Sequence, residues 1–337
     1  MALKEDIKKQ FGDEVVLSGN SIVDKDQIII PVSPALDLGL GGGIPEGSFV
    51  IFTGQPKCGK TTSSLDFTAT ALDKKYQGSL AKPRQAFYLN IEGRLKKRDL
   101  QGIAGLDLDR FEIIGSQQGK ILHGEEYLAI AERIINEIPG SIIIIDSYSA
   151  LCTEAEITSS MDKMQRADGA KLLAKFCRKV ANVIPVNKNI VIGITHLMGN
   201  PTGYGKAFKE KSGQAVAYQT DVKLWAEQVE AWNEPATGPQ IGQKVTWKVV
   251  TSALGPPGGK SVSYLRYGHG IDGVHELTEL CADLGIIKKG GAWYTLISVK
   301  DTPKFQGAAK VRDYLTANPK VADQLHKELK EMMGLTV

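Results

Sequence analysis

Residues 54–61 have the composition and spacing of a phosphate-binding loop. They read GQPKCGKT and fit the pattern GxxxxGK[ST] in full, between an apolar run and a stretch of helical character. The glycines allow backbone N–H groups to close around phosphates, and the positive end of the following helix adds to the attraction. Lys60 would then reach the β- and γ-phosphates of a nucleotide, and Thr61 would bind Mg²⁺. A glycine-rich turn without a ligand is the alternative, and the flanking strand and helix argue against it.

The nucleotide-binding candidates extend one residue past this pattern. They are Gly54, Gln55, Pro56, Lys57, Cys58, Gly59, Lys60, Thr61 and Thr62. Cys58 lies at a helix start, where the pKa of a thiol can be lowered. We interpret Cys58 as one of the variable positions of the pattern, without a chemical role of its own, and its thiol can serve as a chemical probe of the loop.

Three more polar side chains follow apolar runs. Asp146 comes after four isoleucines and suits a carboxylate that positions Mg²⁺, although it could also cap a helix together with Ser147. Glu92 could orient an attacking water and accept its proton, or it could pair with the basic residues at 94–98. His196 could sense the γ-phosphate and pass the signal to the loop that follows, or it could be a structural histidine.

The apolar runs themselves predict the elements that hold these residues. Near-continuous apolar runs suit strands that are buried on both faces, as in a parallel sheet covered by helices. In open α/β sheets, ligands bind beyond the carboxyl ends of the strands, so four strand ends should converge on one place. The predicted strands are 49–52, 86–91, 142–145 and 190–194, and the predicted helices between them are 61–76 and 124–138.

The two ends of the chain differ from this α/β middle. Leu3, Ile7 and Phe11 form one stripe of a short helix, and an apolar strand follows at 28–32. We expect this N-terminal segment to dock on a neighbouring subunit. After about residue 222 the alternation is typical of antiparallel strands, and 272–337 indicates a small domain with a hairpin-like interruption.

Composition limits the class of protein. The 337 residues carry 41 Lys and Arg against 38 Asp and Glu, so the net charge of +3 excludes a bulk polycation. A hydrophobic content of 42% indicates a globular chain rather than a disordered one. The four cysteines form no CxxC pair, which argues against a disulfide framework or zinc site. We expect a cytoplasmic protein without a signal peptide or membrane span.

Two segments carry residues suited to nucleic acid. Lysines interleaved with aromatic residues at 199–214 suit backbone and base contacts on single strands, whereas a solvated loop is the alternative. A second candidate loop near 159–169 is also basic, with Lys171 just beyond it and Arg178 further along the same predicted helix, and a basic helix face is the alternative there. The DNA-binding candidates are Lys163, Met164, Arg166, Lys171, Arg178, Gly199, Asn200, Lys206, Phe208, Lys209, Lys211 and Gly213.

Taken together, these residues resemble the RecA family of bacterial and phage homologous recombinases. The resemblance covers nearly the whole chain, and its C-terminal motifs are far more specific than the phosphate loop. The segments that carry it are 7–12, 33–47, 145–151, 155–157, 199–201, 213, 267–271 and 291–294.

The resemblance implies a fold and a function. The fold is α/β: a short N-terminal oligomerisation arm at 1–32, a RecA-like ATPase core with a mostly parallel sheet at 33–271, and a small C-terminal α/β domain at 272–337. The implied protein binds ATP and Mg²⁺ and hydrolyses ATP when it is bound to single-stranded DNA. It forms a helical homo-oligomeric filament that pairs its strand with homologous double-stranded DNA.

The resemblance also assigns residues. Glu92 matches the catalytic glutamate, and His196 stands where RecA has a glutamine that couples the γ-phosphate to the second DNA loop. Lys171 and Arg178 match basic residues near the DNA. Tyr218 stands where an interface aromatic lies.

Some positions depart from the bacterial pattern. Thr251 and Ala253 replace two lysines that reach the neighbour's ATP, and the acidic C-terminal tail is absent. The register places Asp99 where RecA stacks a tyrosine on adenine, and we predict that Arg98 stacks there instead. These departures favour a phage member. A ring-forming signalling ATPase and a non-catalytic single-strand binder are the alternative functions.

Overall fold

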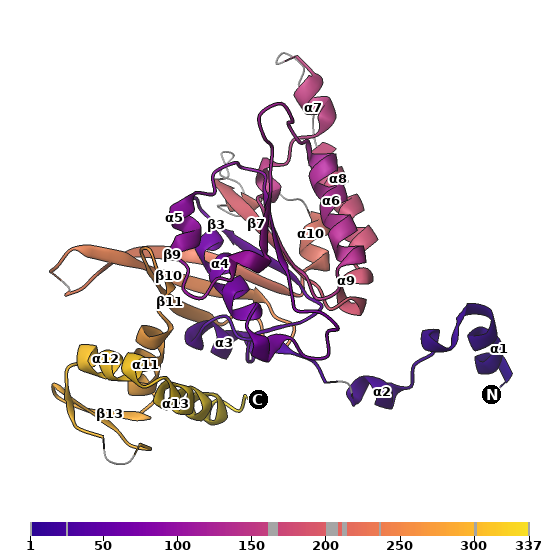
Figure 1. The fold of residues 1–337 in the computed structure, drawn as a ribbon. Helices are drawn as coiled ribbons and strands as arrows, with labels where there is room; N and C mark the ends of the chain where they lie inside the picture. The colour runs from indigo at the N-terminus through magenta and orange to yellow at the C-terminus, as the bar shows by residue number, and fades with distance from the viewer. Residues whose placement is uncertain are drawn as a thin grey trace.

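A large mixed sheet lies at the centre of the computed structural model (Figure 1). The structure describes residues 2–24, 26–160, 168–199, 208–210, 214–235, 237–299 and 302–335. Within them the sheet has ten strands, in the order β12-β11-β10-β9-β3-β7-β6-β4-β5, with β8 paired to β7. The strands from β9 to β5 in this order are mutually parallel, and the remaining pairs are antiparallel.

The strand bounds confirm the four strands predicted from the apolar runs. They correct one expectation: the strand that begins at Val222, whose alternation favoured antiparallel pairing, is antiparallel only to the strand at 240–251 and pairs in parallel with the strand at 49–54. The parallel part consists of β3 Phe49–Gly54, β4 Ala86–Asn90, β5 Phe111–Ile114, β6 Ile142–Asp146, β7 Ile190–Gly199 and β9 Val222–Asn233. The antiparallel additions are β8 Phe208–Glu210, β10 Gln240–Thr251, β11 Lys260–Arg266 and β12 Gly270–Ile271. The four strands predicted from the apolar runs are direct neighbours, in the order β3-β7-β6-β4.

The central strands are apolar over most of their length because each one supplies two cores. Alternate side chains point to opposite faces of a strand. Ile142 and Ile144 of β6 pack on the side of α4 Lys60–Ala71, whereas Ile143 and Ile145 pack under α6 Gly124–Glu137 and α8 Asp168–Val180. Figure 1 shows these helices on opposite faces of the sheet. By the same alternation, Asp146 belongs to the α4 face.

Shorter helices connect these elements. They are α3 Pro34–Leu40, α5 Lys97–Gln101, α7 Glu154–Thr158, α9 Val183–Val186 and α10 Gln214–Gln219, with 3-10 turns at Asp13–Val15, Lys74–Tyr76, Leu108–Arg110 and Tyr148–Ala150. The predicted helix at 61–76 is therefore an α-helix followed by a separate 3-10 turn.

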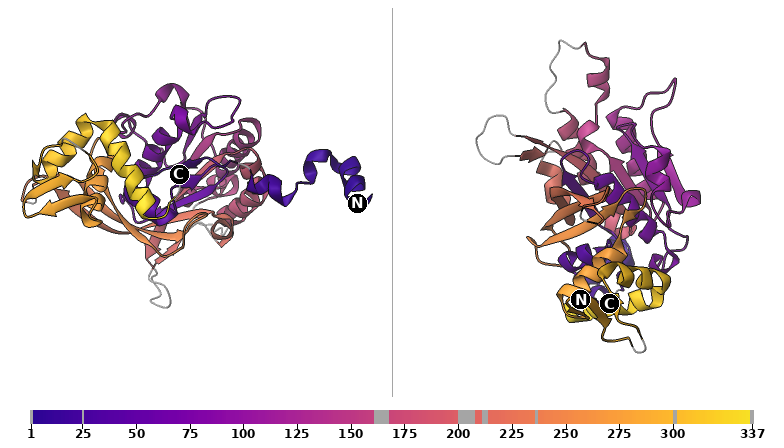
Figure 2. Two further views of the ribbon diagram at one scale, coloured as in Figure 1. Left: turned by 90° about the horizontal axis from the view of Figure 1, so that it is seen from below. Right: turned by 90° about the vertical axis from the view of Figure 1, so that its left-hand side faces the viewer.

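The N-terminal segment forms an arm that extends away from the core (Figure 2). It contains α1 Ala2–Phe11 and α2 Gly19–Val23, and Leu3, Phe11 and Val23 are exposed. The predicted strand at 28–32 differs from the expectation: β1 Ile29–Ile30 pairs with β2 Ile44–Pro45 of the same chain rather than with a neighbour. The reason is that β2 returns beside it, so its backbone groups are paired locally.

The C-terminal unit has a separate apolar core. It consists of α11 Gly273–Asp283, β13 Ile287–Gly290, β14 Trp293–Leu296, β15 Phe305–Gln306, α12 Ala308–Ala317 and α13 Pro319–Met332. Buried Glu276 joins this unit to the core, because its carboxylate accepts hydrogen bonds from the N–H groups of Ala35 and Tyr264. Lys330 of α13 also lies 3.8 Å from the buried carboxylate of Asp37.

Candidate functional site

Strand register brings the predicted chemistry together at one edge of the sheet. Gly54 is opposite His196 across the β3–β7 pair, and Asp146 is opposite Asn90 across the β6–β4 pair. Glu92 follows β4 by two residues, and its backbone N–H donates to the carbonyl of Asp146. The phosphate-binding loop and all three polar residues predicted at strand ends therefore lie around the carboxyl ends of β3, β4, β6 and β7, as expected for an open α/β sheet.

The phosphate-binding loop leads directly into α4. Gly59 has a φ of +84°, and a Cβ on it would lie 2.1 Å from a methyl carbon of Leu265, so this position requires glycine. The ammonium of Lys60 is almost completely buried and donates to the carbonyls of Gly54 and Gln55, at 3.1 and 2.7 Å. Lys60 thus places a positive charge on the inside of the loop, where phosphate oxygens would compete with the two carbonyls for it.

Asp146 and Thr61 provide the oxygen atoms suited to a metal ion. The Thr61 hydroxyl donates to Oδ2 of Asp146 at 2.8 Å, and the Tyr88 hydroxyl donates to the same oxygen at 2.5 Å. Burial raises the pKa of Asp146, and the hydrogen bonds from Tyr88 and Thr61 oppose that rise. Asp146 is 8% exposed and forms no ion pair within the described residues. A divalent cation would supply the missing charge, and a hard ion such as Mg²⁺ prefers oxygen ligands.

The ligand set for such an ion is small. Within the described ranges, no group of three or more His, Cys, Asp and Glu side chains could hold a metal. Mg²⁺ here would therefore be held by Thr61, Asp146, water and the phosphates of a nucleotide, which is the usual arrangement when Mg²⁺ accompanies a nucleotide.

Glu92 and His196 contact each other directly. Nε2 of His196 and Oε1 of Glu92 are 2.7 Å apart, and the Ser147 hydroxyl donates to the same Oε1 at 2.7 Å. The hydrogen bond with His196 is the largest cause that lowers the pKa of Glu92 to about 2. An ionised carboxylate only accepts, so Nε2 carries the proton. The ion pair that was the alternative for Glu92 forms, with Arg94 at 3.6 Å, and the catalytic role of Glu92 stays a prediction.

The base-stacking candidate Arg98 lies on α5 and is 84% exposed. Its neighbour Asp99 instead accepts from the backbone N–H of Lys96 and caps the start of α5. The side chain that extends into solvent at this position is therefore the arginine.

The pKa of the Cys58 thiol is raised, although the start of a helix by itself favours a lower value. Its sulfur is 3.5 Å from the Lys60 ammonium, which favours the thiolate, but burial is the larger effect and raises the pKa. With only 2% of the side chain exposed, desolvation of the thiolate outweighs the nearby charge.

The candidate DNA-binding residues divide into two groups. Gly199 ends β7, Phe208 and Lys209 belong to β8, and Lys171 and Arg178 are exposed on α8. Seven candidates lie outside the described residues: Lys163, Met164, Arg166, Asn200, Lys206, Lys211 and Gly213.

Sequence reasoning missed two residues that the structure adds. Lys175 is exposed on α8 between Lys171 and Arg178, and spacings of four and three residues place all three on one helix face. That spacing is visible in the sequence. Tyr88 was also missed, and the sequence signal for it is weaker. Its hydroxyl is a polar atom within a buried strand, and Tyr88 stands two residues before Asn90, which is opposite Asp146.

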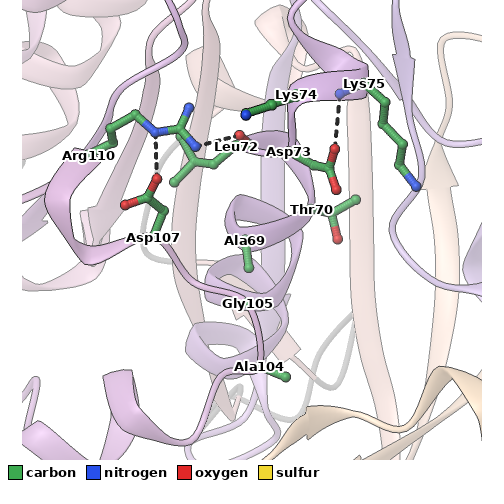
Figure 3. A pocket seen from close by; sticks show the side chains of 10 residues that line it. All are labelled: Ala69, Thr70, Leu72, Asp73, Lys74, Lys75, Ala104, Gly105, Asp107 and Arg110. Atoms are coloured by element: carbon green, nitrogen blue, oxygen red, sulfur yellow. Dashed lines mark hydrogen bonds and ion pairs between the residues drawn. The ribbon is translucent and has the colours of Figure 1, made fainter. Parts of the chain in front are cut away.

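A groove of about 520 Å³ lies at the opposite end of α4 from the phosphate-binding loop (Figure 3). Its lining includes Asp73, Lys74, Lys75, Asp107 and Arg110. The Arg110 guanidinium is already bonded to Asp107 and to the carbonyl of Leu72, at 2.7 and 2.8 Å. The lining residues include none of the site residues described above, so the groove is separate from that site.

Among the helices that the structure describes, none is both long and apolar enough to cross a membrane. Tyr218, the residue at the expected interface aromatic position, lies on α10 and is 84% exposed.

Comparisons with known proteins match nearly the whole chain. A RecA N-terminal domain model matches residues 1–272, and a RecA C-terminal domain model matches residues 275–334. Protein RecA of Thermotoga neapolitana is 30% identical over 340 residues, which covers 99% of this chain and 92% of that protein. Protein RecA of Streptococcus pneumoniae strain Hungary19A-6 is also 30% identical, over 98% of this chain and 82% of its own length.

Proposed function

This chain belongs to the RecA family, and we propose that it is a DNA-dependent ATPase and homologous recombinase that acts in DNA recombination and repair. It forms a helical filament of identical subunits on single-stranded DNA and pairs that strand with a homologous duplex. The observation that carries the proposal is the strand register, which assembles the phosphate-binding loop, Asp146, Glu92 and His196 at one edge of the sheet.

ATP is bound by residues 54–62, with Lys60 on the β- and γ-phosphates and Arg98 stacked on the base. Mg²⁺, held through Thr61 and Asp146, would neutralise charge on the phosphate oxygens. Glu92 orients the attacking water and accepts its proton. The hydrogen bonds from His196 and Ser147 stabilise the Glu92 carboxylate as an anion and weaken it as a base, so Glu92 accepts that proton best when the contact with His196 is broken.

Coupling between ATP and DNA runs along β7. His196 contacts Glu92 and belongs to the strand that leads to Gly199 and the segment that carries the second set of DNA-binding candidates. If ATP favours the arrangement of that segment that binds DNA, DNA must favour ATP binding to the same extent. His196 is thus the residue through which the two sites influence each other.

DNA contacts are made by the two candidate segments and by the exposed α8 face formed by Lys171, Lys175 and Arg178. Lysine and arginine contacts to phosphates release counterions, so binding should weaken as salt increases. Stacking and backbone contacts provide little sequence preference.

The filament is built through the N-terminal arm. Its exposed apolar residues need a covering surface, and a neighbouring copy would provide one. The arm at 1–32, the core at 33–271 and the C-terminal domain at 272–337 are the proposed units. Thr251 and Ala253 cannot supply positive charge to a neighbour's ATP, so any group that acts across the interface lies elsewhere.

ATP hydrolysis, measured with and without single-stranded DNA over a salt series, tests this function. We expect strong stimulation that fades as salt rises, and loss of turnover in Lys60→Ala. Hydrolysis that is indifferent to DNA would contradict the recombinase and favour a ring-forming ATPase. Negative-stain images would then distinguish rings from filaments.

A further inference from the structure

The Tyr88 hydroxyl is buried beside the candidate metal-binding carboxylate. Tyr88 lies in β4, is 2% exposed, and donates to Oδ2 of Asp146 at 2.5 Å. A hydrogen bond from a neutral hydroxyl to an ionised carboxylate is among the stronger hydrogen bonds in proteins. Neither the phosphate-loop pattern nor the catalytic assignments above include Tyr88.

Sheet geometry gives this contact a fixed place. Tyr88 is opposite Ile144 across the β4–β6 pair, and Asp146 is two residues further along β6 on the same face. The Tyr88 ring packs in the core with Phe111, at a centroid distance of 6.3 Å. Because the core holds the Tyr88 ring in place, the ring cannot move when the Asp146 carboxylate rotates. The Tyr88 hydroxyl therefore restrains the orientation of that carboxylate.

Both hydrogen bonds described for the Asp146 side chain end on the same oxygen. Thr61, the second donor to Oδ2, is itself a candidate metal ligand. Tyr88 is therefore the donor that restrains Asp146 without belonging to the ligand set. Groups in this position orient the ligand, and their loss commonly weakens metal binding although they never touch the ion.

We propose that Tyr88 is a positioning residue of the ATPase site, whose hydroxyl holds Asp146 in the orientation that binds Mg²⁺. This inference rests on the proposed function, because it assumes that Asp146 and Thr61 receive the ion that accompanies ATP. It concerns how firmly the site holds that ion and leaves the transfer of the phosphoryl group to Lys60 and Glu92.

The test is Tyr88→Phe, which removes the hydroxyl and keeps the ring. We expect the Mg²⁺ concentration that gives half-maximal ATP hydrolysis to rise about tenfold. The rate at saturating Mg²⁺ should stay close to that of the wild type, because the chemical groups are unchanged. Binding of Mn²⁺, followed by electron paramagnetic resonance with a non-hydrolysable ATP analogue, should weaken by a similar factor without any turnover.

Tyr148→Phe is the matched control. Tyr148 is also buried, at 3% exposed, and its hydroxyl has no hydrogen-bond partner among the residues described. Its removal should leave the Mg²⁺ and Mn²⁺ dependence unchanged. Thermal unfolding of both variants sets a working temperature at which each is folded, so a loss of metal affinity is not confused with unfolding.

The outcomes separate the two proposals. A wild type that lacks DNA-stimulated hydrolysis contradicts the proposed function, whatever the variants do. An active wild type combined with unchanged metal affinity in Tyr88→Phe overturns the role of Tyr88 alone. A lower maximal rate with unchanged Mn²⁺ affinity overturns it as well, because a positioning effect on Asp146 must change metal binding.

Discussion

Replacing His196 with alanine should uncouple ATP hydrolysis from DNA binding while sparing the binding of each ligand. In the structure Nε2 of His196 holds Oε1 of Glu92 at 2.7 Å, and Ser147 and Arg94 also contact that carboxylate. A carboxylate stabilised so strongly as an anion is a weak base. We expect DNA binding to the segment after β7 to move His196 away from Glu92. Loss of this hydrogen bond then restores the basicity of the Glu92 carboxylate.

The size of the effect follows from the pKa of Glu92. A shift from 4.5 to about 2 corresponds to about 3 kcal/mol in favour of the ionised form. Glu92 is 16% exposed, so solvent screens this interaction only modestly. His196 is the largest single cause of this shift, so its loss should restore a good part of the basicity of Glu92, on the order of a tenfold change in rate. The ratio of the rates with and without DNA should therefore fall about tenfold in His196→Ala.

The assay is phosphate release with and without single-stranded DNA, with equilibrium binding of an ATP analogue and of a labelled oligonucleotide measured in parallel. His196→Gln keeps a hydrogen-bond donor at this position and should retain most of the coupling. His123→Ala is the control, because His123 also bonds a glutamate, Glu125 at 2.9 Å, at the start of α6. An unaltered stimulation ratio in His196→Ala would refute the reasoning.

Three further predictions concern the same site and the buried carboxylates. Glu92→Gln should keep ATP and DNA binding and lose at least about 100-fold in hydrolysis; an unchanged rate would remove Glu92 from the mechanism. Buried Cys58 should react with a thiol reagent more slowly than exposed Cys152, and bound ATP should slow the reaction of Cys58 further. Modification of Cys58 should abolish activity, and peptide mapping measures the two reaction rates. Nucleotide binding that survives modification of Cys58 would contradict the placement of the loop. Burial raises the pKa of Asp66 from 3.8 to about 7, so its contribution to stability is fully present below 3.8 and is lost as pH rises through about 7. The melting temperature should therefore fall between about pH 4 and about pH 7, and less so in Asp66→Asn; an equal fall in both proteins would exclude Asp66 as a cause.

The organisation of the RecA-like core could be predicted from the sequence. The loop at 54–61 is a local pattern, because closing backbone around a phosphate requires glycines at fixed spacing. Continuous apolar runs predicted strands buried on two faces, and β3, β4, β6 and β7 are such strands. The rule that ligands lie beyond the carboxyl ends then predicts that Asp146, Glu92 and His196 lie at one edge of the sheet.

The pairing partner of the N-terminal strand could not be predicted in this way. Residues 28–32 have a strand composition, but composition does not name the partner strand. The local return of the chain at β2 decides that β1 pairs within its own subunit. The Cys58 pKa is a similar case, since the sequence shows the nearby lysine but not the burial that outweighs it.

The sequence by itself determined which chemical groups this chain carries: a loop with the phosphate-binding pattern, a carboxylate after a buried strand, and a family pattern along nearly its whole length. Only the tertiary structure decided which of these groups touch. The contacts of Tyr88 with Asp146 and of His196 with Glu92 join residues 58 and 104 positions apart. Such contacts depend on strand order, register and burial, which arise from packing across the whole sheet rather than from any local pattern.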